Sequence, residues 1–292
     1  MEKKLIAQGP KSRKSYTVTL PLEWVKRETL DQSRLVDLEV YGHKVVISSK
    51  KEFQERKVID TDKVKDVLMK VIPMAYRLGV NELKLINLSP ATAKETNLLL
   101  DTKLLGYEII EQTRDSCVIK DISKESPEEF TILLRRVFLI LIELAGQVAI
   151  NVPSKENMGA EQLDRTMKKL INYCQRLLVK QGHKDVRKVP FYYSFCEELE
   201  RIGDEYLWLM EHSKKVDMED LKEANRYLQS TYEIFYNFNM ETYNRIQNET
   251  HKLKNKVREK KLDKSSIFLH NIARRMNSLL GTAFAINFER VT

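Results

Sequence analysis

Residues 13–25 read Arg13-Lys14-Ser15-Tyr16-Thr17-Val18-Thr19-Leu20-Pro21-Leu22-Glu23-Trp24-Val25. Polar and apolar side chains alternate from Ser15 to Thr19, which is the period of a β-strand with one buried face. Pro21 ends the strand and can begin a helix over Leu22 to Thr29, because the first helical position needs no backbone N–H donor. A strand that turns directly into a short helix beside cationic residues is a poor catalytic centre but suits contact with DNA.

Further strands beside this stretch define a first module at residues 1–51. Residues 35–40 and 44–47 flank Tyr41-Gly42-His43, which is typical of a hairpin turn. Residues 4–7 predict another short strand. Because an all-β module of about 50 residues with one helical turn buries little core alone, we expect it to oligomerise.

Residues 58–123 predict a small α/β module with the order helix, strand, helix, strand, strand. Apolar residues recur at helical spacing before Gly79, and Ser89 is suited to cap the helix that begins at Pro90. The predicted elements are a helix at 62–78, a strand at 81–88, a helix at 90–105, and a hairpin of 107–111 with 117–122.

Residues 126–292 contain no convincing strand pattern and predict a helical bundle. Apolar residues recur every three or four positions, as at Leu170, Cys174 and Leu177. We expect two groups of three helices. The first group, in residues 126–213, has helices at 127–151, 159–181 and 187–213. The second group, in residues 217–290, has helices at 217–249, 251–262 and 266–289. The predicted fold class is therefore α+β and mostly α.

The composition bounds the function without choosing one. The 292 residues are 42% hydrophobic and 32% charged, and their 9 Gly and 7 Pro favour long helices. A net charge of +8 permits DNA or acidic partners, although lysine-rich solvated helix faces would explain it equally. The longest apolar run, residues 137–150, is too short to span a bilayer, so we expect no membrane insertion. The three cysteines, Cys117, Cys174 and Cys196, are scattered and lack the spacing of a zinc site or a disulfide framework, which fits a reducing compartment. The sequence also shows no signal-peptide pattern, so we expect the protein in the cytoplasm.

Basic residues gather near the N-terminus, at Lys4, Lys11, Arg13 and Lys14. Cationic side chains on a β framework can neutralise phosphates by counterion release. Arginine can also read guanine edges. The alternative is a charged N-terminus that only aids solubility.

Three segments of the first module together form one sequence pattern: Tyr16-Thr17-Val18-Thr19-Leu20-Pro21, then Trp24-Val25, then the closing strand Val45-Val46-Ile47. Through this pattern the module resembles the SpoVT/AbrB swapped-hairpin family over roughly residues 3–50. The resemblance implies an obligate dimer whose hairpins interleave into a β-barrel. It also implies DNA binding by Lys11, Arg13 and Lys14, with Lys4 as a weaker candidate.

A second motif lies in the helical segment, at Leu199-Glu200-Arg201-Ile202-Gly203-Asp204. Glu200 and Asp204 are four positions apart, so both carboxylates share one helix face. Paired carboxylates on a bundle helix can bind a metal ion if other helices add ligands. The alternative is a solvated acidic face with Arg201 and Lys214 nearby.

The same motif resembles the repeated helix motif of PhoU, a family of phosphate-uptake regulators, and the resemblance spans about residues 126–290. Leu163-Asp164-Arg165 resembles the facing acidic helix of the first repeat. The order of the modules is similar to that of archaeal PhoU-like regulators. It runs from an AbrB-like module through an α/β module to a PhoU-like bundle of two three-helix repeats. In this family the acidic motifs can hold multinuclear metal clusters.

The chain departs from the acidic pattern of that family at Ala160, Gln162, Asn277 and Gly281. Asp164, Glu200 and Asp204 remain as candidate metal ligands. Three carboxylates could hold one divalent or ferric ion but hardly a cluster. The departures therefore shift the weight from metal chemistry toward binding at the N-terminus.

These observations lead to one expected function and two rivals. We expect a cytoplasmic homodimer that regulates phosphate uptake, binds DNA through its first module, and changes operator affinity when an effector or partner binds the bundle. The main alternative is a protein-interaction regulator that docks on a phosphate transporter or a sensor, with the first module serving only dimerisation. No P-loop, GxGxxG or GxSxG motif appears in the sequence, so we expect no enzyme activity, and a metal-dependent enzyme is the weakest class.

Overall fold

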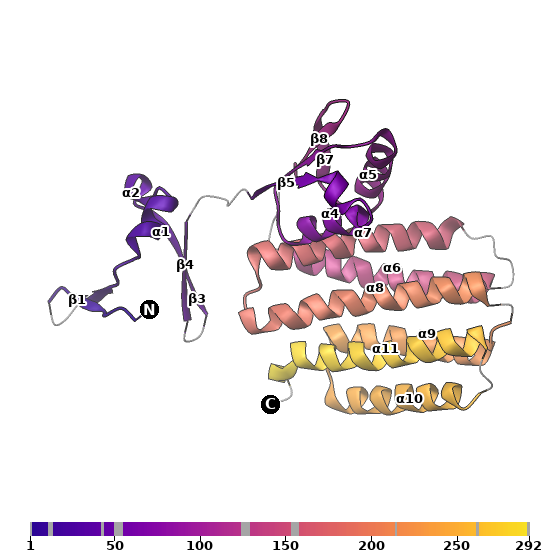
Figure 1. Ribbon diagram of the computed structural model, residues 1–292. Helices are drawn as coiled ribbons and strands as arrows, with labels where there is room; N and C mark the ends of the chain where they lie inside the picture. Colours follow the sequence, from indigo (N-terminus) through magenta and orange to yellow (C-terminus); the bar gives the residue numbers. More distant parts are fainter. Residues whose placement is uncertain are drawn as a thin grey trace. The chain divides into compact units, whose positions relative to one another are not determined.

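A computed structural model describes residues 2–10, 14–41, 44–49, 55–123, 129–152, 158–213, 215–260 and 263–290. The chain divides into two compact units, Met1–Phe53 and Gln54–Thr292, which we call the first unit and the second unit (Figure 1).

The first unit consists of two small antiparallel sheets and two short helices. Its elements are β1 (Ile6–Gln8), β2 (Ser15–Thr17), α1 (Leu22–Arg27), α2 (Leu30–Ser33), β3 (Val36–Tyr41) and β4 (Lys44–Ser49). Helix α1 begins directly after Pro21, whose extended backbone (φ −61°, ψ 127°) ends the preceding stretch, as the sequence predicts. The helix ends two residues earlier than expected, because Thr29 has a left-handed backbone (φ 53°).

The two sheets of the first unit stay separate in the described residues of one chain. Strand β1 pairs only with β2, and β3 pairs only with β4, so these strands do not close a barrel. Among the described residues of this unit, Leu30 is the one apolar side chain that is buried. The described part of a single copy therefore has almost no core.

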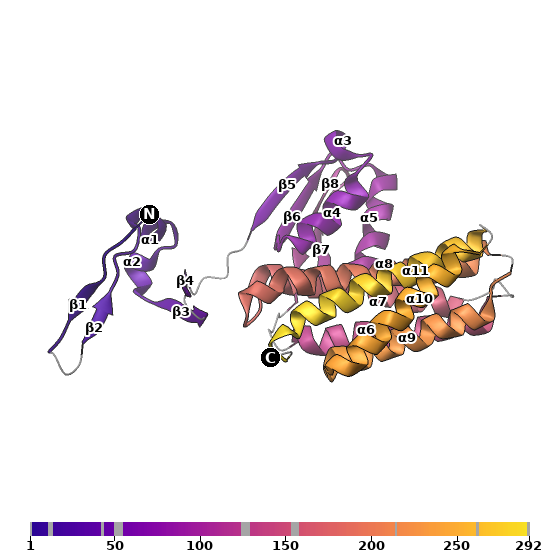
Figure 2. The same cartoon turned by 90° about the horizontal axis from the view of Figure 1, so that it is seen from below.

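The second unit begins with a four-stranded sheet in the order β5-β6-β8-β7. Strand β5 runs parallel to β6, and the other two pairings are antiparallel. Its elements are β5 (Arg56–Asp60), α3 (Thr61–Val64), α4 (Leu68–Arg77), β6 (Glu82–Ile86), α5 (Pro90–Lys103), β7 (Tyr107–Gln112) and β8 (Ser116–Asp121). Figure 2 shows α4 and α5 lying over one face of this sheet.

Two sequence predictions for this sheet region need correction. Strand β5 was not expected, because its charged sequence does not alternate clearly and lies at an edge of the sheet. The helix predicted at 62–78 is two helices, α3 and α4, because the backbone leaves the helical region at Val67 (φ −126°, ψ 3°). The cap at Ser89 is confirmed, since its side chain accepts a hydrogen bond from the backbone N–H of Thr92 (3.1 Å).

The rest of the second unit is a bundle of long helices, as the sequence predicts. The helices are α6 (Glu129–Asn151), α7 (Met158–Gln181), α8 (Val189–His212), α9 (Met218–Tyr236), α10 (Met240–Arg258) and α11 (Lys264–Ile286), with short turns η1 (Val186–Lys188) and η2 (Phe288–Arg290). The helix predicted at 217–249 is wrong. It breaks after Tyr236, and Asn239 caps α10 by accepting the N–H of Thr242 (2.9 Å).

The sheet and the bundle share one continuous apolar core. Helix α7 packs against α4 and α5 as well as against α6 and α8, so it joins the sheet to the bundle. Within the described ranges, every helix is too short or too polar to cross a membrane.

Candidate functional site

The predicted DNA-binding residues lie around the β1–β2 pair. Lys4 and Lys14 are exposed, and neither forms an ion pair with another described residue; Lys11 and Arg13 lie outside the described residues. The β1–β2 ladder pairs Gln8 with Ser15, so it holds the two ends of the segment that joins these strands close together. Because Lys4 and Lys14 are exposed, an anionic partner can reach both of them.

Exposed apolar side chains accompany these cations in the first unit. Leu38 is 59% exposed, and the cross-strand pair Val40 and Val45 on β3 and β4 is also exposed. Tyr16, beside Lys14, is 62% exposed. Burial of such side chains against another surface is strongly favourable, at about 25 cal/mol for each Å² of apolar area. The first unit thus displays exposed cations around β1 and β2 and also offers apolar area, mainly on β3 and β4, to a second molecule.

The three predicted metal ligands are brought together between α7 and α8 of the bundle. The ammonium of Lys168 on α7 donates hydrogen bonds to Asp164 Oδ2 and Asp204 Oδ1, each at 2.7 Å. The second carboxylate oxygen of Asp164 is buried and has no hydrogen-bond partner within the described ranges. We call Asp164, Lys168, Glu200 and Asp204 the acidic cluster.

Burial dominates the electrostatics of the acidic cluster. It raises the pKa of Asp164, and the hydrogen bond from Lys168 only partly offsets this. Burial likewise raises the pKa of Glu200, against the charge of Arg77. Burial would lower the pKa of Lys168, but the hydrogen bonds to Asp164 and Asp204 keep it above its usual range. The ammonium therefore stays charged between the two aspartates.

The carboxylates of the acidic cluster are arranged to bind the ammonium of Lys168 rather than a metal ion. Lys168 bridges two of the three carboxylates at full hydrogen-bond strength. Across the ranges that the structure describes, no group of three or more His, Cys, Asp or Glu side chains is arranged to hold a metal ion. Metal binding by Asp164, Glu200 and Asp204 remains a prediction from the resemblance, and no step of the proposed function depends on it.

Gly203 of the same motif lies on α8 where the buried side chain of Met167 on α7 packs against it. A Cβ atom at this position would collide with the Cε atom of Met167 on α7, a buried side chain. Gly281 on α11, which follows a similar sequence pattern, faces open space. Gly203 therefore has a packing role that Gly281 lacks.

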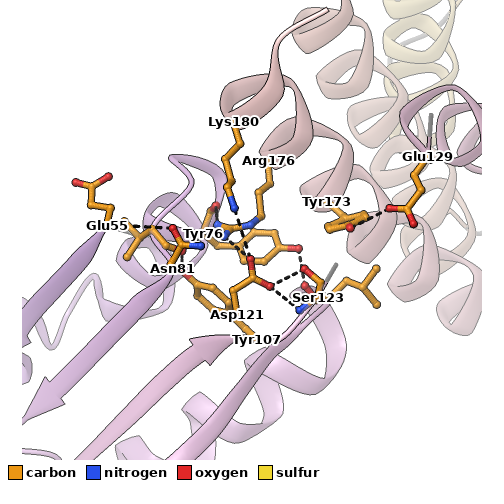
Figure 3. A network of polar contacts seen from close by, with 12 residues as sticks. Glu55, Tyr76, Asn81, Tyr107, Asp121, Ser123, Glu129, Tyr173, Arg176 and Lys180 are labelled. Carbon is orange, nitrogen blue, oxygen red and sulfur yellow. Dashed lines mark hydrogen bonds and ion pairs between the residues drawn. The ribbon is translucent and has the colours of Figure 1, made fainter. Parts of the chain in front are cut away.

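A buried arginine that the sequence did not single out joins the bundle to the sheet (Figure 3). Arg176 on α7 is fully buried and donates hydrogen bonds to Asp121 Oδ2 (2.5 Å), the carbonyl of Tyr76 (2.6 Å) and the carbonyl of Val80 (3.0 Å). Its guanidinium also lies 4.8 Å from the ring centre of Tyr76 and 5.5 Å from that of Tyr107.

Asp121 completes this network at the end of β8. Its other oxygen, Oδ1, accepts hydrogen bonds from the backbone and hydroxyl of Ser123, at 3.0 and 2.6 Å. Burial would raise the pKa of Asp121, but the hydrogen bonds from Ser123 and the charge of Arg176 lower it below its usual value. A charged pair is therefore balanced inside the junction of sheet and bundle.

The sequence located part of these sites. It identified the carboxylates of the acidic cluster but missed Lys168, although the spacing of four residues between Asp164 and Lys168 was a signal; the bond from Lys168 to Asp204 crosses from one helix to another and has no such signal. The one signal for Arg176 in the sequence was that a charged residue stands within a largely apolar helical run around Leu177. Comparisons with protein family models, curated proteins and solved structures found no match to this chain.

Proposed function

We propose that this chain is a homodimeric, DNA-binding regulator of phosphate uptake. The observation that supports it most is the first unit, where exposed apolar strands and exposed cations occur together with almost no core. The resemblance to the swapped-hairpin family supplies the expected partner, a second copy. The resemblance of the bundle to PhoU supplies the link to phosphate.

The dimer follows from the apolar side chains of β3 and β4. Leu38 and the pair Val40–Val45 gain a buried environment if the hairpins of two copies interleave, as in a swapped-hairpin barrel. A module of this size does not otherwise bury enough surface to fold stably. Folding and dimerisation of the first unit are then one process, so its stability depends on protein concentration.

DNA binding follows from the four cations of each chain, Lys4, Lys11, Arg13 and Lys14. A dimer doubles their number, and the phosphate contacts release counterions in proportion to the charges neutralised. Arg13 can add a bidentate contact to guanine. The DNA affinity should therefore fall steeply with salt.

The bundle is proposed to bias the DNA-binding geometry. An effector or partner that binds one bundle arrangement more tightly shifts the population toward it, and operator affinity changes by the same coupling free energy. In this proposal the protein acts in the cytoplasm as a regulator and not as an enzyme.

The test compares two variants that remove equal charge from the two units. Fluorescence anisotropy with a random-sequence 30-base-pair duplex at about 150 mM salt measures nonspecific affinity, for which typical dissociation constants are about 10⁻⁴ to 10⁻⁶ M. Arg13→Ala with Lys14→Ala should weaken binding at least tenfold. The control, Lys252→Ala with Arg258→Ala, removes two exposed cations of α10 and should leave binding nearly unchanged. Equal affinities in the two variants would refute the DNA contacts.

Phosphate regulation needs a separate experiment. Genome-wide mapping of the DNA bound by the protein at high and low phosphate should find occupancy near phosphate-transport genes that changes between the two conditions. Occupancy that ignores phosphate would reject the regulatory part of the proposal and retain DNA binding.

One observation favours the alternative of docking on a transporter or a sensor. The bundle exposes large aromatic side chains at Phe191, Trp208 and Phe288, and aromatic residues are enriched where proteins meet. Under that alternative the wild-type protein would show neither DNA affinity at about 150 mM salt nor a steep salt dependence.

A further inference from the structure

Strand β5 leaves one side of its backbone open. Within the described residues it pairs only with β6, and Figure 2 shows it at the edge of the sheet. The carbonyl of Glu55 accepts the N–H of Glu82 (3.1 Å), so alternate residues from Glu55 onward turn their backbone toward β6. The N–H and C=O groups of Arg56 and Val58 therefore point away from the sheet. An open edge of this kind is a template for another strand.

Apolar side chains of α4 flank the open edge. Met74 is 51% exposed, and Leu78, the residue that caps the C-terminus of α4, is 59% exposed; the two lie one helical turn apart on the same side. With Val71 and Lys57 they line a groove of about 600 Å³ between α4 and β5. On the opposite face of the strand, Val58 is 66% exposed. In the described residues, the outer backbone groups of β5 are thus unpaired by another strand, and the apolar side chains beside them are exposed.

We propose that the occupant of this edge is β5 of a second copy of the chain, paired antiparallel about a two-fold axis at Val58. Such an axis places Val58 opposite the partner's Val58, and Arg56 opposite the partner's Asp60. Opposite charges that face each other across strands stabilise the pairing. The strand is therefore complementary to itself, which is the requirement for a symmetric interface.

The local partners of the two charged residues leave them able to pair across the axis. Arg56 Nε lies 3.6 Å from Glu82 Oε2, and Asp60 Oδ2 lies 3.8 Å from Lys63 Nζ, so both ion pairs are long. Asp60 uses its other oxygen, Oδ1, to accept hydrogen bonds from Asn87 and from the backbone of Asp62. Oδ2 can therefore face the partner's Arg56.

The same axis brings the two α4 helices together. Because a two-fold axis perpendicular to the sheet keeps both helices on the same face, Met74 and Leu78 meet the partner's Met74 and Leu78 beside the paired strands. The two four-stranded sheets then continue as one, and the groove fills with apolar side chains. An extended peptide from another protein would fill the backbone edge but would not match the α4 side chains.

Cysteine cross-linking tests this pairing in the full-length chain. In an antiparallel pair the Cα atoms of directly opposed residues lie about 4.5–5.5 Å apart. A disulfide accommodates this separation. Oxidised glutathione should therefore convert most of a Val58→Cys variant to a covalent dimer. The native cysteines are buried and should not interfere.

Lys84→Cys is the matched control, because Lys84 lies beside Val58 on the neighbouring strand and is also exposed. Its distance from the partner's Lys84 would exceed the reach of a disulfide, so we expect at least tenfold less cross-linking. Equal cross-linking of the two variants, or none in Val58→Cys, would overturn the pairing. In the second case an extended segment of another protein becomes the occupant to seek.

A second substitution tests the α4 contact. Leu78→Glu, introduced into the Val58→Cys variant, should lower cross-linking several-fold while the helical circular dichroism stays unchanged, since the side chain is exposed in one chain. Unchanged cross-linking would exclude the α4 contact. The pairing does not rest on the proposed function, since it uses none of the cations of the first unit. Loss of cross-linking with intact DNA binding, or the reverse, shows which of the two proposals has failed.

Discussion

In the second unit apolar side chains from the sheet and six long helices fill one continuous core, whereas in the first unit they lie mostly on the surface of a single chain. The second unit also buries charges in balanced pairs, as at Arg176 and Asp121. The first unit has no such interior in its described residues. The difference favours a second unit that folds by itself and a first unit that, as proposed above, gains its core from a second copy.

The largest effect is expected from Arg176→Met. The substitution leaves Asp121 buried without its counter-charge and removes donors from the carbonyls of Tyr76 and Val80. Removing one partner of a buried ion pair costs about 3–5 kcal/mol. Urea denaturation of the second unit's helical signal should show a loss of that size.

Arg187→Ala is the control for that loss. Arg187 also pairs with carboxylates, Asp185 at 2.7 Å and Glu289 at 3.3 Å, but it is well exposed. Exposed pairs contribute less than about 1 kcal/mol. If both variants lost similar stability, the balance at Arg176 would not be what stabilises the junction.

Leu38→Asp tests the dependence of the first unit on a second copy. In a single chain Leu38 is 59% exposed, and an exposed substitution would change stability by no more than about 0.5 kcal/mol. In an interleaved dimer the carboxylate would be buried, so the amides of β3 and β4 should lose their protection from hydrogen exchange. Ile132→Asp, at an exposed position of α6, should leave protection of the second unit unchanged.

Lys168→Met should make the stability of the second unit depend on pH. Without the ammonium, Asp164 loses the hydrogen bond and the charge that partly offset its burial, and the charge of Asp204 stays nearby, so the pKa of Asp164 rises further above its unfolded value. A raised folded-state pKa means that the ionised carboxyl destabilises the fold, and that stability returns as pH falls through that pKa. We expect a loss of about 1–3 kcal/mol at pH 7 that shrinks at pH 4–5. A loss that is the same at both pH values would contradict the ammonium's role.

The smallest effect is expected from substitutions at two helical glycines, Gly203 on α8 and Gly281 on α11. Gly281→Ala should gain up to about 1 kcal/mol, because alanine favours the helix and nothing obstructs its Cβ atom. Gly203→Ala gains the same propensity but must displace Met167, and overpacking costs about 1–3 kcal/mol. Thermal unfolding should therefore rank Gly281→Ala above Gly203→Ala, and the opposite order would exclude the packing role of Gly203.

Local signals explain which elements could be predicted from the sequence. Pro21, Ser89 and Gly79 mark helix ends through backbone geometry and capping, and each does so in the structure. The break before Asn239 was also encoded locally but was obscured by a continuous apolar period. Strand β5 was missed because an edge strand carries charged residues, so its pattern is that of a loop.

The candidate sites divide in the same way. Spacing along one helix placed Glu200 and Asp204 on a common face, which the structure brings to Asp164. Lys168 pairs with Asp164 at the local spacing of four residues, but its bond to Asp204 and the bond of Arg176 to Asp121 join residues distant in the sequence, and no local pattern records those contacts. Pairing across elements depends on the packed fold.

The central claim is that two copies of the first unit together present their cations to DNA. The slope of log binding constant against log salt concentration tests it most directly, with the wild type and Arg13→Ala with Lys14→Ala measured on the same duplex. Each phosphate contact contributes about 0.9 to the slope, so a dimer that loses four cations should lose up to about 4 from it. A slope that stays the same in the variant would contradict the claim.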